Sequence, residues 1–444
     1  MIDIFRGLLG MGAIVLLTWL FSNNRKAVNW RLVGVGLGIQ FVLAVLILKG
    51  DPMSQYWAPL GWPKAFFSWV SSFFVIVLDF TTEGAEFIFG DLAKSPGTEN
   101  SMGSFFAFQV LPTIIFFASL TAILYHYGIM QRVVRYMARG MQKLMGTSGA
   151  ESLSVISNIF VGQTEAPLVI KPYISRMTPS ELLAVMTGGM ATIAGGVMAA
   201  YVQMLGNSYA QAQGVGLDAG RLLFAEQLLG ASLMAAPAAL VIAKILYPET
   251  GEPETSGEVQ MTIEKTDANG IDAAASGAGT GLKLAANVGA MLLAFIALLA
   301  MGNYFLEQLG GLTGLNGLIS GGPLRIETIL GWILAPVAFM VGVPWADAVQ
   351  MGSLLGTKIV LNEFVAYMQM SELVSGGALS PKTTLMATFA LCGFANFSSI
   401  AIQIGGIGGL APDRKSDLAR FGITAVFAGT LANLMTATIA GMLY

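Results

Sequence analysis

Two short polar stretches interrupt long apolar runs, and they carry the residues whose types could do chemistry. The first is Gln163-Thr164-Glu165 and the second is Asn362-Glu363. Each stretch joins a carboxylate to amide or hydroxyl groups, which can both accept and donate hydrogen bonds. An ionisable residue at membrane depth is costly and commonly marks a functional site. The two stretches are therefore the first candidates for a binding site.

The composition of the chain is that of a membrane protein. Of the 444 residues, 55% are hydrophobic and 11% are charged, whereas a soluble domain carries about 25% charged residues. Several apolar runs approach the ~20 residues that cross a bilayer core. The single cysteine, Cys392, and the single histidine, His126, cannot form an internal disulfide framework or a Cys/His metal cluster. They supply no nucleophile–base pair either, which argues against a hydrolase.

Hydropathy and charge predict eight spans with both termini outside. A short loop with Arg25 and Lys26 lies in the cytoplasm by the positive-inside rule. The acid-rich region 51–104 stays outside, and its short apolar run, residues 65–78, is expected to lie in the interface. The basic stripe that starts at Arg132 predicts an amphipathic helix on the cytoplasmic surface. The predicted spans are residues 8–21, 32–48, 105–125, 182–205, 222–246, 282–300, a seventh that begins at Ser380-Pro381, and 423–444.

The stretch around Gln163 lies too close to basic residues on both sides to belong to a full crossing. Ser148 and Glu151 have the spacing of a capping box, so a helix should start there, about a dozen residues before the tip. Lys171 and Arg176 mark the return to the cytoplasmic side. We predict a re-entrant hairpin over residues 148–175, with a tip that protein buries or that lines a wet cavity.

Spans four and seven each contain a polar interruption. Residues 192–196 combine a threonine with two glycines, which favour either an open helical ladder or a close helix–helix contact. The pattern alone does not distinguish these two. Residues 393–399 interrupt span seven in a similar place. Both spans begin with a hydroxyl N-cap followed by proline, Thr178-Pro179 and Ser380-Pro381.

The order of elements after span three recurs after span six in the opposite orientation. Each unit holds a span, an interfacial segment, an acidic hairpin, a broken span and a last span. Opposite orientation of equivalent units is the inverted repeat of secondary transporters, whose site lies at the midplane between them. The predicted division is 1–127 for scaffold spans one to three with interfacial segment 51–104, 128–247 for the first repeat with hairpin 148–175, 248–281 for a polar cytoplasmic linker, 282–327 for scaffold span six and an outer loop, and 328–444 for the second repeat with hairpin 344–372.

The convergent tips and breaks favour a neutral polar solute. Lys358, the nearest basic residue, is interpreted as the end of a hairpin arm or a member of a local ion pair, so nothing is left to bind an anion. Each glutamate taken alone could also be a structural hydrogen-bond partner. Donor and acceptor edges of a base suit one tip, ribose hydroxyls suit carboxylate and amide groups, and an aromatic face could pack against a ring. The residues are Gln163, Thr164 and Glu165 for the base, Glu363, Asn396 and Ser399 for the ribose, and Phe394 for the ring.

Three motifs give the chain a family resemblance. They are Gly162-Gln163-Thr164-Glu165-Ala166-Pro167, Asn362-Glu363-Phe364-Val365-Ala366-Tyr367 and Cys392-Gly393-Phe394-Ala395-Asn396-Phe397-Ser398-Ser399. With them the sequence resembles the concentrative nucleoside transporters over essentially its whole length, and most of all the bacterial sodium-coupled members. The resemblance implies a homotrimer in the bacterial inner membrane, with eight spans, two re-entrant hairpins and interfacial helices in each protomer. It also implies cation-driven uptake by an elevator movement of a transport domain.

The resemblance also implies roles for single residues. Gln163, Thr164 and Glu165 would contact the nucleobase, with Val197 lining its pocket. Glu363, Asn396 and Ser399 would hold the ribose, and Phe394 would face it. The sodium ion would be bound by the Asn158 side chain, the Val161 and Ile193 carbonyls and the Thr192 hydroxyl. The bacterial pattern has serine where this chain has Thr192, and threonine keeps the oxygen.

The sequence therefore predicts a sodium-coupled symporter of uridine-like nucleosides rather than an enzyme. Its partners would be the nucleoside, the lipid bilayer and further copies of the chain, with no nucleic acid. Two alternatives stay open. Coupling to protons would need a titratable group such as Glu165, and a polar-solute channel or receptor could use the same re-entrant tips.

Overall fold

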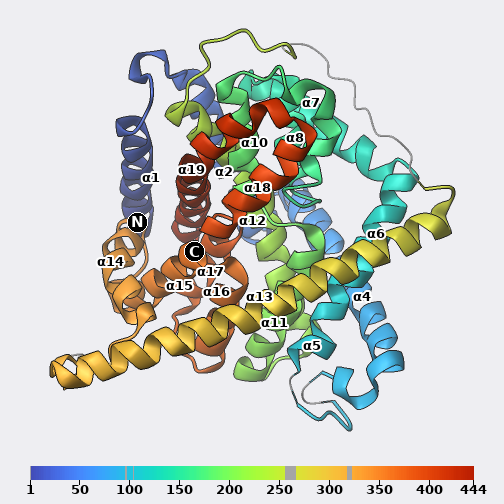
Figure 1. The fold of residues 1–444 in the computed structure, drawn as a ribbon, viewed down its shortest axis with the longest axis vertical. Coiled ribbons are helices and arrows are strands. Elements are labelled where there is room, and N and C mark those ends of the chain that lie inside the picture. The colour runs from blue at the N-terminus through green and yellow to red at the C-terminus, as the bar shows by residue number, and fades with distance from the viewer. Residues whose placement is uncertain (1, 96–97, 104, 256–266, 318–322) are drawn as a thin grey trace.

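The protein is built from helices throughout the part of the chain that the structure describes (Figure 1). The computed structural model describes residues 2–95, 98–103, 105–255, 267–317 and 323–444. Eight helical segments in these ranges are long and apolar enough to cross a membrane. The predicted all-α membrane fold with eight such segments is confirmed, but residues 58–93 are among the eight and the predicted seventh span, which is broken into two short helices, is not.

The N-terminal third contains four of these segments. The helices are α1 (Ile2–Leu20), α2 (Trp30–Leu48), α3 (Gly50–Ser54), α4 (Trp62–Phe89), α5 (Phe106–Gln109) and α6 (Leu111–His126), with 3-10 turns Arg25–Ala27, Ala58–Gly61 and Gly90–Ala93. The short apolar run expected at 65–78 is wrong in its extent, because α4 has 28 residues and is long enough to cross. Three of the six acids that suggested a loop lie on this helix, Asp79, Glu83 and Glu86. One of them, Asp79, pairs with the Arg221 guanidinium at 3.0 Å.

The first repeat follows the predicted order. It comprises α7 (Ile129–Met145), α8 (Gly149–Ser157), a 3-10 turn (Ala166–Ile170), α9 (Lys171–Ile174), α10 (Pro179–Ala191), α11 (Gly195–Gln213) and α12 (Leu217–Leu246). The basic amphipathic helix is α7. The capping box at the start of α8 forms as expected, since the Ser148 side chain accepts from Glu151 N and the Glu151 carboxylate accepts from Ser148 N. Such caps contribute about 1 kcal/mol each.

The second repeat has the same order at the other end of the molecule. Its helices are α14 (Ile326–Met340), α15 (Ala348–Val360), α16 (Glu363–Ser375), α17 (Pro381–Leu391), α18 (Phe397–Leu410) and α19 (Lys415–Met442), with 3-10 turns Trp345–Asp347 and Pro412–Arg414. Figure 1 shows α7, α8 and α10 at one end and α14, α15 and α17 toward the opposite end. The two units therefore run in opposite senses.

The two broken helices match each other in register. Thr178 and Ser380 cap α10 and α17, while Ala194 and Asn396 are the N-caps of α11 and α18. The number of residues between the two caps is the same in both repeats. This internal match, together with the opposite orientation, supports the inverted repeat that the sequence predicts.

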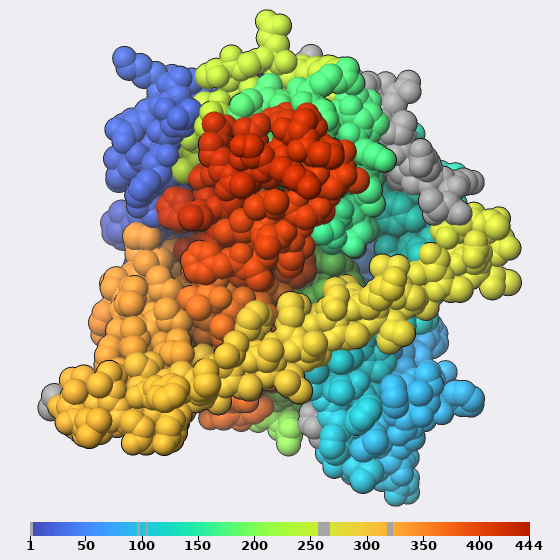
Figure 2. All heavy atoms as spheres, viewed as in Figure 1, coloured from blue at the N-terminus to red at the C-terminus, as the bar shows by residue number. Residues whose placement is uncertain are grey.

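The buried centre of the fold is formed by α10, α12 and α19, whereas α13 (Gly270–Leu312) lies outside it. The most apolar window of α12 is 89% buried, against 17% for that of α13. Figure 2 shows α13 crossing one face of the molecule as an exposed ridge. A short 3-10 turn, Leu315–Gly317, follows it.

The expected polar linker 248–281 is shorter than predicted and partly docked. Its residues 256–266 lie outside the described part of the chain, and α13 already begins at Gly270. The Thr255 carbonyl accepts from Gly149 N at 2.8 Å, and its hydroxyl accepts from Ala150 N at 3.1 Å. Because α8 needs partners for its first N–H groups, the linker supplies them.

Candidate functional site

The tip of the second hairpin buries its carboxylate among polar partners. Asn362 caps α16, accepting from Val365 N at 2.9 Å, which places Glu363 in the first helical turn. The Glu363 carboxylate accepts from the Tyr201 hydroxyl at 2.9 Å and from Asn396 Nδ2 at 3.0 Å. Only 4% of Glu363 is exposed. A buried carboxylate is tolerated when hydrogen bonds to charged acceptors replace its hydration, and these are stronger than neutral ones.

The break in the seventh predicted span links the two tips. Asn396 Oδ1 accepts from Ser399 N at 2.9 Å and from the Ser398 hydroxyl at 2.7 Å. The Ser399 hydroxyl in turn accepts from Gln163 Nε2 at 3.1 Å. One line of hydrogen bonds therefore runs from α11 through α16 and α18 to the first hairpin. It brings together four of the predicted substrate-binding residues, Gln163, Glu363, Asn396 and Ser399.

The other predicted substrate residues flank this line. Thr164 packs against α18, where a Cβ on Gly406 would lie 2.8 Å from its methyl carbon. Val197 is buried in the first turn of α11, and Phe394 is half-buried in the break itself. Glu165 is exposed, and its carboxylate lies over Gly162, where a Cβ would approach Oε2 to 2.1 Å. The structure thus leaves Glu165 apart from the buried Glu363 network.

The break in the fourth predicted span is open, which decides between the two interpretations of its glycines. Helix α10 ends at Ala191 and α11 begins at Gly195, so residues 192–194 leave the helical ladder. Gly195 N donates to the Phe160 carbonyl at 3.2 Å. The break is therefore held directly against the first hairpin.

The predicted sodium ligands are all oxygen atoms, and one of them, Asn158 Oδ1, is buried without a hydrogen-bond partner among the described residues. Asn158 follows α8 and is buried. Its Nδ2 donates to the Ser154 carbonyl at 3.1 Å, while its Oδ1 has no hydrogen-bond partner among the described residues. The Thr192 hydroxyl donates to the Gly188 carbonyl at 2.9 Å, which leaves its lone pairs available. A hard cation takes oxygen ligands of this kind, so these residues fit the ion that the sequence predicts.

Three polar residues of the site escaped the sequence interpretation. Gln403 is buried in α18, and its Nε2 donates to Gln163 Oε1 and to the Met186 carbonyl, both at 3.0 Å. Tyr201 and Asn433 are fully buried as well, on α11 and α19. Each comes from a distant element without a local motif. The only signal is a polar residue within an apolar helix.

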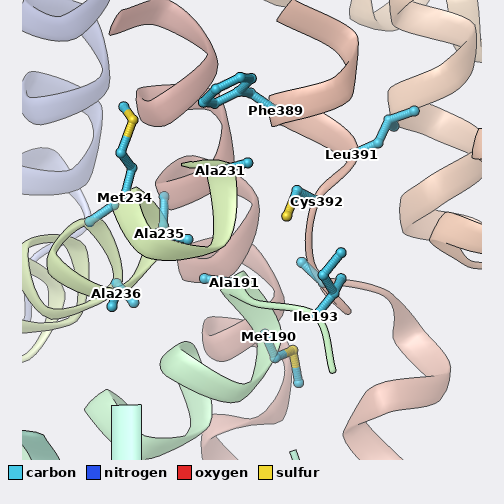
Figure 3. Packing of buried hydrophobic residues seen from close by; sticks show 14 of the residues in the cluster. Met190, Ala191, Ile193, Ala231, Met234, Ala235, Ala236, Phe389, Leu391 and Cys392 are labelled. Atoms are coloured by element: carbon cyan, nitrogen blue, oxygen red, sulfur yellow. The ribbon is translucent and has the colours of Figure 1, made fainter. Parts of the chain in front are cut away.

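Lys358 takes the first of its two predicted roles, since it lies in the last turn of α15 and ends the first arm of the second hairpin. Among the described residues its partners are neutral groups and not a carboxylate. Its ammonium donates to the Ala390 carbonyl at 3.0 Å and to Asn433 Oδ1 at 2.7 Å. Figure 3 shows the ends of α10 and α17 meeting nearby, with Ala191 and Cys392 facing alanines of α12.

Comparison of the sequence with models of known protein families identifies the family of the chain. The model of the Na+ dependent nucleoside transporter C-terminus matches residues 227–441, that of the N-terminus matches residues 9–92, and a nucleoside recognition model called Gate matches residues 107–208. Together these models cover most of the chain.

Relatives and solved structures agree with the family models. The chain is 46% identical to the uncharacterized transporter YutK of Bacillus subtilis, covering 99% of both chains. It is 43% identical to the nucleoside permease NupC of Helicobacter pylori, covering 98% of this chain and 96% of NupC. Human sodium/nucleoside cotransporter 1 is 40% identical, over 98% of this chain and 63% of that protein.

A solved structure of CNTnw in an inward-facing substrate-bound state superposes with a TM-score of 0.84 at 43% identity, covering 99% of this chain and 98% of that one. Fold, motifs and relatives therefore agree along nearly the whole length. The chain is a multi-pass membrane transporter, not an enzyme, and it belongs to the concentrative, Na+ dependent nucleoside transporter family.

Proposed function

We propose that the protein couples the inward movement of sodium to the uptake of uridine-like nucleosides across the bacterial inner membrane. The observation that carries the proposal is the line of hydrogen bonds from Tyr201 through Glu363, Asn396 and Ser399 to Gln163. It joins both hairpin tips and both broken spans through groups that can exchange these bonds for bonds to a nucleoside.

The distribution of donors and acceptors along this line favours a nucleoside over other polar solutes. Glu363 and Asn396 offer acceptors for vicinal hydroxyls such as those of ribose. Gln163 and Thr164 offer an amide and a hydroxyl for the edge of a base, with Glu165 beside them. Val197 and Phe394 supply the apolar surface that a planar ring requires. These roles are the ones that the family resemblance implies for the same residues.

Sodium is the coupling ion that the oxygen set around Asn158 favours. The ion would be held by the Asn158 side chain, the Thr192 hydroxyl and the carbonyls of Val161 and Ile193. Because Ile193 lies in the same break that abuts Phe160 at the first hairpin, a bound ion would stiffen the tip that contacts the base. Binding of the ion and of the nucleoside would then favour one another.

The transport movement would be of the elevator type, in a homotrimer. The most apolar windows of the fourth predicted span and of α12 and α19 are 78–89% buried, while those of α13 and α6 are 17% and 28% buried. A buried unit of this kind can move against peripheral helices that are held by neighbouring protomers and lipid. The site would then move with this unit and open to one side of the membrane and the other in turn.

The test is uridine uptake into proteoliposomes with sodium replaced by choline at fixed pH. We expect uptake against the uridine gradient in sodium and its loss in choline. Uptake that persists in choline and follows a pH gradient would replace sodium by protons and assign the proton to Glu165, which Glu165→Gln would check. Uridine flux that runs only down its own gradient and does not depend on sodium or pH would indicate a channel and contradict the symporter proposal.

A further inference from the structure

Lys358 is a buried lysine to which the proposed transport cycle so far gives no role. It lies in the last turn of α15 and is 1% exposed. Its ammonium donates to the Ala390 carbonyl and to Asn433 Oδ1. Burying an ammonium costs several kcal/mol unless nearby groups compensate it. Its surroundings must therefore supply negative potential.

The ends of two half-helices supply that potential. Ala390 is the penultimate residue of α17, so its carbonyl belongs to the negative end of that helix. Asn433 Nδ2 donates at 2.7 Å to the carbonyl of Ala191, the last residue of α10. One ammonium and one amide thus join the C-terminal ends of both broken helices.

The junction is too tight for any residue but glycine at its centre. Gly393 has φ +145°, and a Cβ there would lie 2.7 Å from Asn433 Oδ1 and 2.7 Å from the Met190 carbonyl. Such a conformation is open to glycine alone without strain. The backbone of the α17 break is therefore pressed directly against the amide that Lys358 binds.

The first repeat handles the equivalent helix end differently. Gly188 follows the N-cap Thr178 by the same number of residues as Ala390 follows the N-cap Ser380. The Gly188 carbonyl accepts from the Thr192 hydroxyl, which is one of the proposed sodium ligands. The hairpins can be compared in the same way from their N-caps, Ser148 and Asp347. The residue of the second hairpin that corresponds to Asn158 is Thr357, which immediately precedes Lys358.

We propose that the Lys358 ammonium is a fixed cation that does in the second repeat what the coupling ion does in the first. It neutralises the C-terminal end of the half-helix before the break, and it ties this end to the hairpin. The comparison with the coupling ion rests on the proposed sodium coupling. The hydrogen bonds of Lys358 to Ala390 and Asn433 do not depend on that proposal.

The fixed cation acts on the substrate site through a closed ring of contacts. From Lys358 the chain runs through the hairpin tip to Glu363, whose carboxylate accepts from Asn396. From Asn396 the chain runs back through the break to Ala390, which accepts from Lys358. Lys358 is thus a positioning residue, which sets the distance between the tip and the break and so the two groups proposed to bind ribose.

The experiment compares two substitutions in the full-length protein reconstituted in liposomes, at fixed sodium and pH. Lys358→Met keeps the length of the side chain and removes its charge, and Lys358→Ala leaves a space for a small cation. Lys382→Ala is the matched control. Lys382 is a buried lysine at the start of α17, the helix whose last turn Lys358 contacts, and it is paired with Asp3. Size-exclusion elution in detergent establishes that each variant is assembled.

We expect uridine uptake by Lys358→Met to fall about 10-fold or more, as for the loss of a buried charged hydrogen-bond donor. Ammonium or methylammonium, but not choline, should restore part of the uptake by Lys358→Ala and leave Lys382→Ala unaffected. Wild-type uptake by Lys358→Met would overturn the proposal, even if the alanine variant does not fold. Equal responses of the two alanine variants to ammonium would overturn it too. If wild-type uptake does not depend on sodium, the proposed sodium coupling is wrong. The rescue of Lys358→Ala by ammonium still tests the role of Lys358 in that case.

Discussion

The two hairpin tips hold their carboxylates in opposite environments. Glu363 in the second hairpin is buried and accepts from Tyr201 and Asn396, whereas Glu165 in the first hairpin is exposed and lies over its own loop. The helix ends behind the tips differ in the same way. The second repeat carries its own ammonium, while the first leaves Asn158 Oδ1 unpartnered. The second tip thus finds its partners within the protein, whereas the first is the one that the proposed solutes would complete.

This difference explains why the halves should respond differently to substitution. In the second repeat Glu363, Asn396 and Lys358 already have partners within the protein, so removing one of these side chains leaves another buried and unsatisfied. In the first repeat the missing partners are the proposed solutes, so a substitution there should change how uptake depends on the concentrations of sodium and uridine. The comparison makes predictions of graded size.

The largest effect is expected at Glu363. Glu363→Gln removes the charge that accepts from Tyr201 and Asn396, and an amide cannot accept from both while keeping its own donors satisfied. We expect uridine uptake to fall about 100-fold or more, as for two lost charged hydrogen bonds. The control is Glu372→Gln, an exposed residue further along the same helix. Similar uptake by both variants would remove Glu363 from the site.

A smaller and more selective effect is expected at Thr192. Thr192→Val removes the hydroxyl oxygen and keeps the shape, so the sodium concentration for half-maximal uptake should rise about 10-fold, with little change at saturating sodium. Thr187→Val is the matched control, since Thr187 is buried on α10, just before the break that holds Thr192, and also donates to the carbonyl four residues before it. If both variants keep the wild-type sodium response, the ion lies elsewhere.

A third effect concerns the orientation of Gln163. Gln403 donates to Gln163 Oε1, which turns the amide donor of Gln163 toward the Ser399 hydroxyl. Gln403→Leu frees that amide to rotate, so the KM for uridine should rise about 3- to 10-fold with kcat nearly unchanged. Gln40→Leu, in the buried part of α2, is the control. A fall in kcat with an unchanged KM would assign Gln403 to the transport movement instead.

The helix starts and the two breaks around the candidate site could be predicted because their signals are local. The capping box of α8 and the N-cap hydroxyls before proline at the starts of α10 and α17 are read from neighbouring residues, and polar residues within apolar runs located both breaks. Gln403, Tyr201 and Asn433 could not be found in this way. Their partners are distant in the chain, and a single polar residue in an apolar helix does not say what it will meet.

The extent of α4 was missed for a related reason. Its acids suggested an outer loop, since the Arg221 that neutralises Asp79 lies on α12. The docking of Thr255 on α8 was missed because composition describes a linker without saying what it contacts. Long-range pairing of polar groups, rather than helix formation, is the part of this fold that the sequence conceals.

The smallest predicted effect again separates the two repeats, at the starts of their broken helices. In the first repeat the N-cap Thr178 is held by Glu181 of its own helix, with Glu249 from the linker. In the second, Ser380 and Thr383 donate their hydroxyls to Asp347 of the hairpin, both at 2.6 Å. Burial raises the pKa of Asp347, but these hydrogen bonds outweigh it and hold the pKa below its ordinary value of 3.8.

Because that pKa is lowered in the folded protein, the contribution of Asp347 to stability is present above its unfolded value and is lost as the pH falls through the folded one. Asp347→Asn should therefore cost about 1–3 kcal/mol at neutral pH, the range for a buried acceptor that loses its charge. The difference in melting temperature from wild type should shrink as the pH falls below about 4. Asp51→Asn, at an exposed position, should show no such difference at either pH. A difference that stays constant with pH would mean that Asp347 acts by its shape rather than its charge, and that the hairpin and the broken helix of the second repeat are joined mainly through Lys358.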